Sequence, residues 1–262
     1  MEAVIAIIVK KFKKCGQREK IVAQKMKPDL NLESNNELPN GTLYLVSTPI
    51  GNLKDITIRA IEVLSKVDLI AAEDTRRTAI LLQHFNITTP TTSYFDFNKE
   101  KKIPVLLKRL QEGEKIALVS DAGTPGISDP AYKLVRECVE NKVPLEAIPG
   151  ATAFVPALVL SSLPTDRFVF EGFLPKKKGR KKRIDFLKDD PRTLIFYESP
   201  HRLATTFTDL EQSFGSRRAA LVREITKKFQ EIHRGTVFEL KSKLSQIKLK
   251  GEFVLVIEGK SK

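Results

Sequence analysis

The chain has 262 residues, 41% hydrophobic and 29% charged, which is the composition of a globular protein with one large or two modest domains. The sequence contains no run of about 18 apolar residues, so we expect no membrane-spanning helix. The apolar segment at residues 3–9 precedes its basic residues, which is the wrong order for a secretory signal. Cys15 and Cys138 lack metal-ligand spacing, which favours a reducing, cytoplasmic setting over a disulfide framework.

The net charge of +13 comes from two basic segments. Residues 1–27 contain eight Lys and Arg against two Glu, and the run KKKGRKKR at 176–183 contains seven basic residues and no acid. The remaining residues are balanced, with 30 basic and 30 acidic side chains. A dense basic run indicates an anionic partner such as nucleic acid, although a solvated surface run stays open. Residues 1–39 predict a flexible basic tail and polar linker, of which the first 25 could be a start-site extension.

An alternation of strands and helices begins at Thr42. We predict strands at 42–47, 68–74, 115–121 and 143–148. Helices are predicted at 55–67 with Asp55 as N-cap, at 102–113 closed by Gly113, and at 130–141, with Asp129 before the helix and Pro130 at its first position. This rhythm predicts a mostly parallel sheet with helices on both faces, in a first domain at 40–162.

The pattern restarts near residues 161–168. Apolar runs predict strands at 168–173, 192–199, 219–225 and 252–259, and the helical patterns lie at 200–215 and 236–244. The sequence therefore predicts a second α/β domain at 163–262, which carries the basic run.

Several predicted strands are followed by loops that could hold a ligand. In parallel α/β sheets, ligands bind beyond the carboxyl ends of the strands. The loops there are STPIGN (47–52), EDTRRT (73–78), DAGTPG (121–126), PGATA (149–153), FYESPHR (196–202) and a long segment at 222–236. Glycine and proline in three of them allow the backbone to approach a flat polar ligand such as adenosine. Phosphate-loop and dinucleotide motifs are absent from the sequence, as is a zinc or catalytic-triad pattern, so we predict no metal site.

Taken together, these segments resemble one family. LYLVSTPIGNLKDITIRA, AAEDTRRT, LVSDAGTPGISDP, IPGATA, FEGFLP, FYESPHRL and REITKKFQEIHRGT occur in order between residues 41 and 259. They are similar to the ribosomal RNA small-subunit methyltransferase I family, within the tetrapyrrole-methylase (class III) enzymes that use S-adenosylmethionine (SAM). The resemblance implies a two-domain α/β fold, with a mostly parallel first sheet and a mixed second sheet, and SAM bound between the domains.

The resemblance also implies an activity. It indicates a cytoplasmic homodimer that methylates the ribose 2′-hydroxyl of one cytidine of 16S rRNA (family position C1402) in the 30S subunit. Two alternatives remain open at this point: a SAM methylase of tetrapyrroles or other small molecules, and a non-catalytic RNA-binding factor for ribosome assembly.

The motifs assign residues to three roles. The donor-binding residues implied by the resemblance are Pro49, Gly51, Asp121, Gly123, Gly126, Ile127, Ser128, Ala151, Thr152, Phe196 and Tyr197. A ribose hydroxyl is a poor nucleophile that benefits from a general base, for which the candidates are Glu73, Asp74 and Glu198. The predicted RNA contacts are Arg76, Lys176, Lys177, Lys178, Arg180, Lys181, Lys182, Arg183, Arg202 and Arg223. Internal salt-bridge networks that brace the loops are the competing interpretation of EDTRR and VRE.

Overall fold

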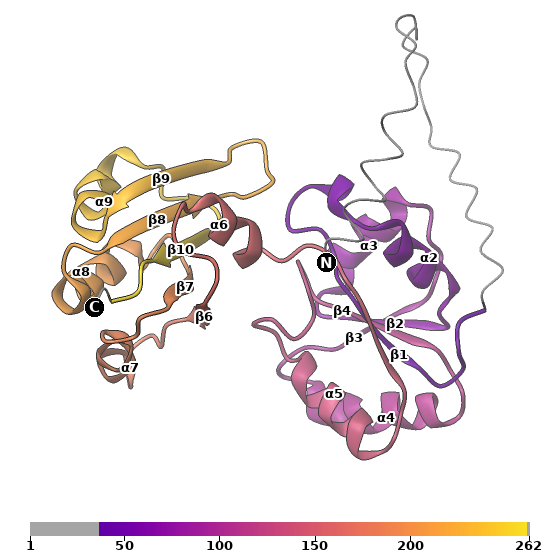
Figure 1. Cartoon of the computed structure of the whole chain (residues 1–262). Helices are drawn as coiled ribbons and strands as arrows, with labels where there is room; N and C mark the ends of the chain where they lie inside the picture. Colours follow the sequence, from indigo (N-terminus) through magenta and orange to yellow (C-terminus); the bar gives the residue numbers. More distant parts are fainter. Residues whose placement is uncertain (1–36, 261–262) are drawn as a thin grey trace, which may run out of the picture. The chain divides into compact units, whose positions relative to one another are not determined.

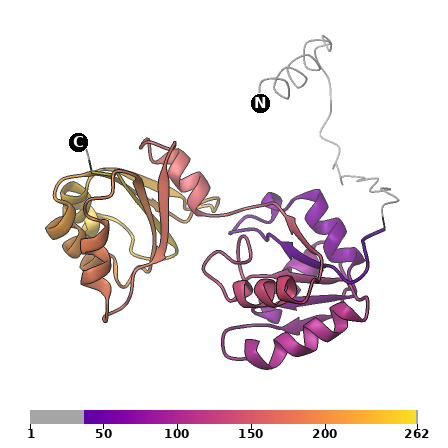
Figure 2. The same cartoon turned by 60° about the horizontal axis from the view of Figure 1, so that its bottom comes forward.

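The structure is a computed structural model that describes residues 37–260. This part of the chain contains two five-stranded sheets (Figures 1 and 2). These residues belong to one compact unit. Most of the predicted tail and linker, residues 1–36, lies outside the described residues.

The first sheet has five parallel strands in the order β3-β2-β4-β1-β5. Its strands are β1 Leu43–Val46, β2 Leu69–Ala72, β3 Thr91–Ser93, β4 Ile116–Val119 and β5 Leu145–Ile148. The helical segments connecting them are η1 Leu53–Asp55, α2 Ile58–Lys66, α3 Thr75–His84, α4 Lys99–Gln111 and α5 Ala131–Glu140. The four residues of β2 and of β4 are all buried, as expected for strands covered on both faces.

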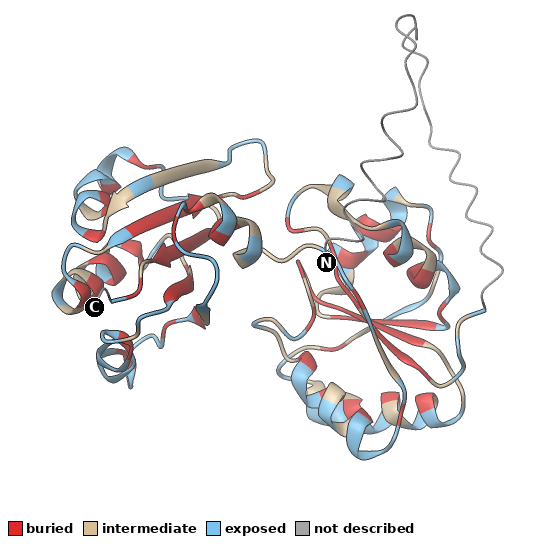
Figure 3. Ribbon diagram, viewed as in Figure 1, coloured by how far each residue is buried: buried red, intermediate tan, exposed pale blue. Residues whose placement is uncertain are grey.

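Helices cover both faces of this sheet. Successive residues of β1 enter different clusters: Tyr44 packs with residues of α2 and α3, and Leu43 packs with residues of α4 and α5. The burial colours show the strands as the inner layer and the outward helix faces as exposed (Figure 3). The carboxyl ends of β1, β2 and β4 therefore share one edge, where their loops can meet.

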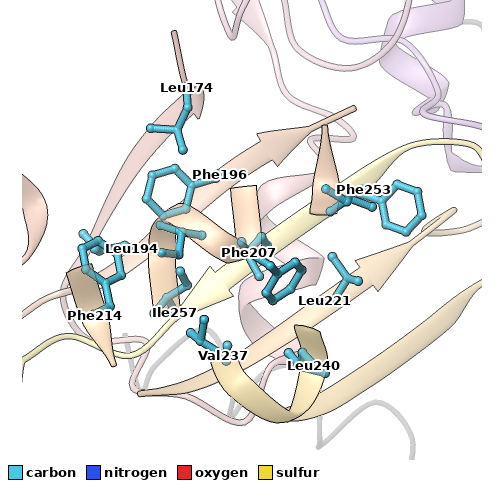
Figure 4. Close-up of a cluster of buried hydrophobic side chains, with 14 of the residues drawn as sticks. Leu174, Leu194, Phe196, Phe207, Phe214, Leu221, Val237, Leu240, Phe253 and Ile257 are labelled. Atoms are coloured by element: carbon cyan, nitrogen blue, oxygen red, sulfur yellow. The ribbon is translucent and has the colours of Figure 1, made fainter. Parts of the chain in front are cut away.

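The second sheet is mixed, in the order β6-β7-β10-β8-β9, with β6 and β7 parallel and the other pairs antiparallel. Its strands are β6 Phe168–Phe173, β7 Thr193–Glu198, β8 Arg218–Arg223, β9 Glu231–Thr236 and β10 Phe253–Ile257. The helical segments of this half are α6 Phe154–Leu160, α7 Arg180–Leu187, α8 Leu203–Phe214, α9 Val237–Lys243 and η2 Leu244–Gln246. One face buries a cluster that contains Phe196 and Phe207 beneath α7, α8 and α9 (Figure 4). The predicted parallel and mixed sheets are both confirmed.

Helix α6 covers the other face of the second sheet. Its Ala157 and Leu158 pack with Ile195 and Val254 in one hydrophobic cluster. Helix α6 therefore packs on the second sheet although it precedes residue 162. The division of the domains at residue 162 stays a prediction.

The structure corrects two predicted helix starts. Asp55 lies in η1, and α2 is capped by Thr57, whose hydroxyl accepts the N–H of Ala60 at 3.1 Å. Helix α5 begins at Ala131, one residue later than predicted, and the Asp129 carboxylate accepts the Ala131 N–H at 2.9 Å.

Candidate functional site

A cavity of about 360 Å³ lies at the carboxyl edge of the first sheet and extends to the end of β7. We call it the main cavity. Six of the predicted donor-binding residues line it, namely Asp121, Gly123, Ile127, Ser128, Thr152 and Tyr197. Gly126 and Ala151 belong to the same loops without lining the cavity.

The loop after β4 has a backbone that is fixed by its own contacts. Gly123 and Gly126 have φ of +91° and +93°, values that glycine adopts without a steric penalty. Gly123 also exchanges two backbone hydrogen bonds with Thr48, of 2.9 and 3.0 Å. Ser128 has φ of +70°, which is a strained conformation for a residue with a side chain. The loop is therefore held in an unusual shape against the cavity.

The Thr124 hydroxyl connects the three glycine- and proline-rich loops. Its oxygen lies 2.9 Å from Ser47 Oγ, in the loop after β1, and 2.6 Å from Thr152 Oγ1, in the loop after β5. It also lies 3.1 Å from the carbonyl oxygen of Ala151. The sequence placed these loops after separate strands, and the structure brings them together at one hydroxyl.

The two carboxylate oxygens of Asp121 have different surroundings. Its Oδ2 pairs with Arg77 Nη1 at 3.0 Å, whereas its Oδ1 is buried and has no hydrogen-bond partner among the described residues. A buried carboxylate oxygen without a partner is costly unless a ligand supplies a donor. The main cavity therefore offers a ligand a charged acceptor.

Arg77 is a site residue that the sequence analysis missed. It lines the main cavity and lies in the quoted EDTRRT motif, beside the predicted Arg76. The adjacent arginine and the motif itself were the available signal. Only the fold shows which of the two guanidinium groups reaches Asp121.

Glu73, the first candidate base, lines the main cavity directly after β2. Its Oε2 accepts the backbone N–H of Asp121 at 3.1 Å. Burial raises the pKa of Glu73, and the nearby carboxylates of Asp121 and Asp129 raise it further, against the lowering effect of that hydrogen bond. A carboxyl group with a raised pKa is a stronger base than an ordinary carboxylate and is therefore better suited to accept a proton.

Asp74 does not line the cavity. It caps α3 and binds Arg76 through three hydrogen bonds, from the backbone N–H at 2.9 Å and from Nε and Nη2 at 3.0 and 2.8 Å. These bonds hold the pKa of Asp74 well below its usual range. The contacts make Asp74 a helix cap that pairs locally with Arg76, whose side chain is 89% exposed.

Glu198, the third candidate base, lines the main cavity but is only 2% exposed. Its carboxylate accepts hydrogen bonds from Ser199 N–H at 2.7 Å, Thr206 Oγ1 at 2.6 Å and Arg202, whose Nε also pairs with it at 3.0 Å. With both oxygens occupied, Glu198 has the contacts of a structural anchor. Arg202 is engaged in the same network and donates to the carbonyl oxygen of Leu174 at 2.7 Å.

Phe196 and Tyr197 are neighbours on β7 and point to opposite faces of the sheet. Tyr197 lines the main cavity, whereas Phe196 is fully buried in the cluster beneath α8. The prediction that both approach the donor is therefore wrong for the Phe196 side chain, because alternation along a strand forbids it.

Pro49 and Gly51 line a neighbouring cavity of about 200 Å³. This second cavity shares Arg77 and Asp121 with the main one. The loop after β1 thus lines a cavity together with Asp121.

The basic run forms the loop before α7 and the first turn of this helix. Five lysines of the run are exposed: Lys176, Lys177, Lys178, Lys181 and Lys182. Arg183 is exposed as well, and it holds Glu171 through two hydrogen bonds of 2.7 and 2.8 Å. Arg180 is buried and donates to Asp209 and Thr206, both at 2.7 Å.

Two predicted RNA contacts are therefore wrong. Arg180 braces α7 against α8 and does not face solvent. Arg223 is 4% exposed and is bound to Glu231 and to the carbonyl oxygen of Lys250, at 2.8 and 2.7 Å. A guanidinium that is buried and paired inside the domain has no free face for a phosphate.

Residues 37–260 contain neither a cluster of metal ligands nor a helix that could span a membrane. No group of three or more His, Cys, Asp and Glu side chains in this range is placed to hold a metal ion. No helix in the same range has the length and apolar character that crossing a bilayer requires.

Comparisons with known proteins agree with this geometry. The family model of the tetrapyrrole (corrin/porphyrin) methylases matches residues 42–241. Proteins named ribosomal RNA small subunit methyltransferase I are 54% identical in Synechocystis sp., over 84% of this chain and 79% of the relative, and 52% identical in Escherichia coli O157:H7, over 84% and 78%. The protein of that name from Thermotoga maritima is 46% identical, over 84% of this chain and 99% of the relative.

Solved structures share the fold at low sequence identity. A diphthine synthase has a TM-score of 0.66 at 16% identity, covering 84% of this chain and 90% of its own. Uroporphyrin-III C-methyltransferase from Thermus thermophilus, complexed with S-adenosylhomocysteine, has a TM-score of 0.59 at 17% identity, covering 83% and 97%. Since a family model spans most of the chain and relatives match it at about half of the aligned positions, this chain belongs to the tetrapyrrole (corrin/porphyrin) methylases, in the branch of the ribosomal RNA small-subunit methyltransferase I proteins.

Proposed function

We propose that this chain is a SAM-dependent methyltransferase of 16S rRNA that modifies the ribose 2′-hydroxyl of a cytidine, at family position C1402, within the 30S subunit. The relatives carry the name of a small-subunit rRNA methyltransferase. The observation that carries the proposal is the main cavity, which residues of three glycine- and proline-rich loops line together with Asp121, whose Oδ1 is buried and unpaired among the described residues.

The residues of the main cavity fit SAM. Asp121 supplies a charged acceptor for a hydroxyl or ammonium donor, and Thr152 adds a polar side chain. Ile50, Ile127 and Tyr197 supply apolar surface for the flat adenosine part. When bound there, SAM supplies the electrophilic methyl group of the reaction.

The chain's own residues align the acceptor and accept its proton. Methyl transfer is an in-line displacement, so the 2′-oxygen has to be aligned with the bond that breaks. Glu73 lies in the main cavity with a raised pKa, and we assign it the proton of the 2′-hydroxyl as that oxygen attacks the methyl carbon. Arg77 holds the Asp121 carboxylate through the 3.0 Å ion pair.

The exposed lysines at 176–178, 181 and 182 supply the contacts to the RNA backbone. A substrate of this kind places the enzyme in the cytoplasm. The homodimer remains part of the proposal, and α6 offers exposed apolar residues for it, Val155 and Val159 at 48% and 67%. Light scattering after size-exclusion chromatography measures that state directly.

One assay separates this proposal from its alternatives. The protein is incubated with radiolabelled SAM and, in parallel, with 30S subunits lacking the modification, free 16S rRNA or a porphyrinogen. We expect label in the 30S subunits, recovered as 2′-O-methylcytidine after nuclease digestion, and much less label with Asp121→Ala at a limiting SAM concentration. Label in the porphyrinogen would support a tetrapyrrole methylase, and the absence of label from all three would support a non-catalytic assembly factor.

A further inference from the structure

A groove beside α7 is not explained by the main cavity. It has a volume of about 470 Å³ and is lined by Glu171, Phe173, Leu174, Lys182, Arg183 and Phe186, among others. We call it the α7 groove. Two of its aromatic side chains are unusually open to solvent, with Phe173 55% exposed and Phe186 72% exposed.

A β-bulge in β6 gives Phe173 its orientation. Phe170 lies opposite Ile195 of β7, but the next paired residue, Gly172, lies opposite Phe196, so β6 contains one extra residue. An inserted residue reverses the alternation of side chains that follow it. Phe173 consequently lies on the same face as Tyr197, with 5.7 Å between the ring centroids.

Phe173 thereby lines both the main cavity and the α7 groove. It lines the main cavity together with Tyr197, and it lines the α7 groove together with Phe186. A chain molecule that places one unit at the main cavity can therefore place an adjacent unit in the groove.

The charges of the α7 groove favour an anionic occupant. Its one acidic lining residue, Glu171, has a side chain that is 4% exposed and is bound by Arg183. The Arg183 guanidinium carbon lies 5.3 Å from the centroid of the Phe186 ring, and Lys182 is exposed beside it. Open aromatic faces interleaved with cations are the combination that binds unpaired bases and the phosphates between them.

We propose that the α7 groove stacks an unpaired RNA base on Phe186 and Phe173, next to the nucleotide held at the main cavity. This inference rests on the proposed function for the identity of the RNA. Lys182 and Arg183 of the basic run thereby do more than attract RNA, since they line a groove that selects single-stranded RNA over duplex RNA. Base pairing removes the free aromatic face that stacking requires.

The test measures RNA binding without methyl transfer. Fluorescence anisotropy compares the full chain and its variants on a short labelled oligocytidine and on the same strand in a duplex. Phe186→Leu keeps the apolar volume but loses the aromatic face. We expect it to weaken single-strand binding at least about fivefold and to leave duplex binding unchanged. Phe186→Tyr restores the wild-type affinity.

Phe238→Leu is the matched control, since Phe238 is 57% exposed on α9 and does not line the groove. Unchanged single-strand binding by Phe186→Leu overturns the inference, and so does an equal loss on single strand and duplex or an equal loss with Phe238→Leu. If Phe186→Leu loses single-strand binding as expected but the wild-type protein leaves 30S subunits unmethylated, the proposed function is refuted and the inference about the groove stands.

Discussion

Arg77 Nη1 lies 3.0 Å from Asp121 Oδ2, and this ion pair leaves the other carboxylate oxygen of Asp121 buried and unpaired within residues 37–260. Both residues line the main cavity and the second cavity. The arginine side chain is 67% exposed, so the pair itself adds little to stability. The ion pair instead fixes the position of the carboxylate, because it holds Oδ2 and leaves Oδ1 for a ligand.

We expect Asp121→Ala to weaken the binding of S-adenosylhomocysteine about tenfold or more, because a hydrogen bond to a charged group contributes about 1.5–3 kcal/mol. Arg77→Ala should have a smaller effect, since the carboxylate remains but is less well oriented. Isothermal titration calorimetry measures both affinities. Asp129→Asn disturbs the same loop without removing Asp121 Oδ1, so it measures how much loop damage alone weakens binding. An affinity of Asp121→Ala equal to wild type would refute the assignment of Oδ1.

Glu73 should make stability depend on pH. Burial is the largest cause of its raised pKa, so the ionised form is disfavoured in the folded protein. The cost is absent below about pH 4.5, the ordinary pKa of the group, and grows as the pH rises through the folded pKa. We therefore expect Glu73→Gln to melt at a higher temperature than wild type at pH 7.5 and at about the same temperature at pH 4.

Differential scanning fluorimetry at the two pH values checks this sign. A melting difference that is the same at both would contradict a raised pKa. The same variant should lose most of its methyl transfer while it still binds S-adenosylhomocysteine, because glutamine retains the acceptor for the Asp121 N–H but cannot take a proton.

Glu198→Ala should act on folding. The substitution leaves Arg202 and Thr206 without their buried partner, and breaking a buried pair in this way costs about 3–5 kcal/mol. Urea denaturation measures the free energy of unfolding. Glu100→Ala, at an exposed ion pair with Lys133, is the control and should change little. A Glu198→Ala protein of wild-type stability but without methyl transfer would return Glu198 to the list of catalytic candidates.

The apolar runs predicted the buried strands well because β2, β4 and β10 are buried at every position. Strand β9, Glu231–Thr236, lies in a segment that the sequence predicts as a loop, because its six residues are polar or half-buried at the edge of the sheet. The start of α3 is hidden for a related reason: its first turn, TRRT, resembles a charged loop, and the cap at Asp74 becomes visible only in three dimensions.

Side-chain direction limited the prediction of the site. A motif names residues without saying which face of an element each one occupies. Phe196 and Tyr197 were therefore treated alike although one lies in the core and the other at the cavity. Arg180 belongs to a uniform run of basic residues, where no pattern distinguishes the one side chain that points inward to Asp209. The Arg77–Asp121 contact joins helix α3 to the loop after β4, two segments that are far apart along the chain.

The lysines at 176–178 allow a test of the RNA surface by salt dependence. All three are exposed in the loop before α7, and replacing them together with alanine removes charges that would displace counterions from RNA. We expect weaker binding to 16S rRNA and a shallower slope of log Kd against log salt, with unchanged affinity for S-adenosylhomocysteine. Filter binding at several salt concentrations measures the slope. A triple alanine variant of Lys101, Lys243 and Lys248, which are also exposed, is the charge-matched control, and a slope equal to wild type at 176–178 would refute the contact.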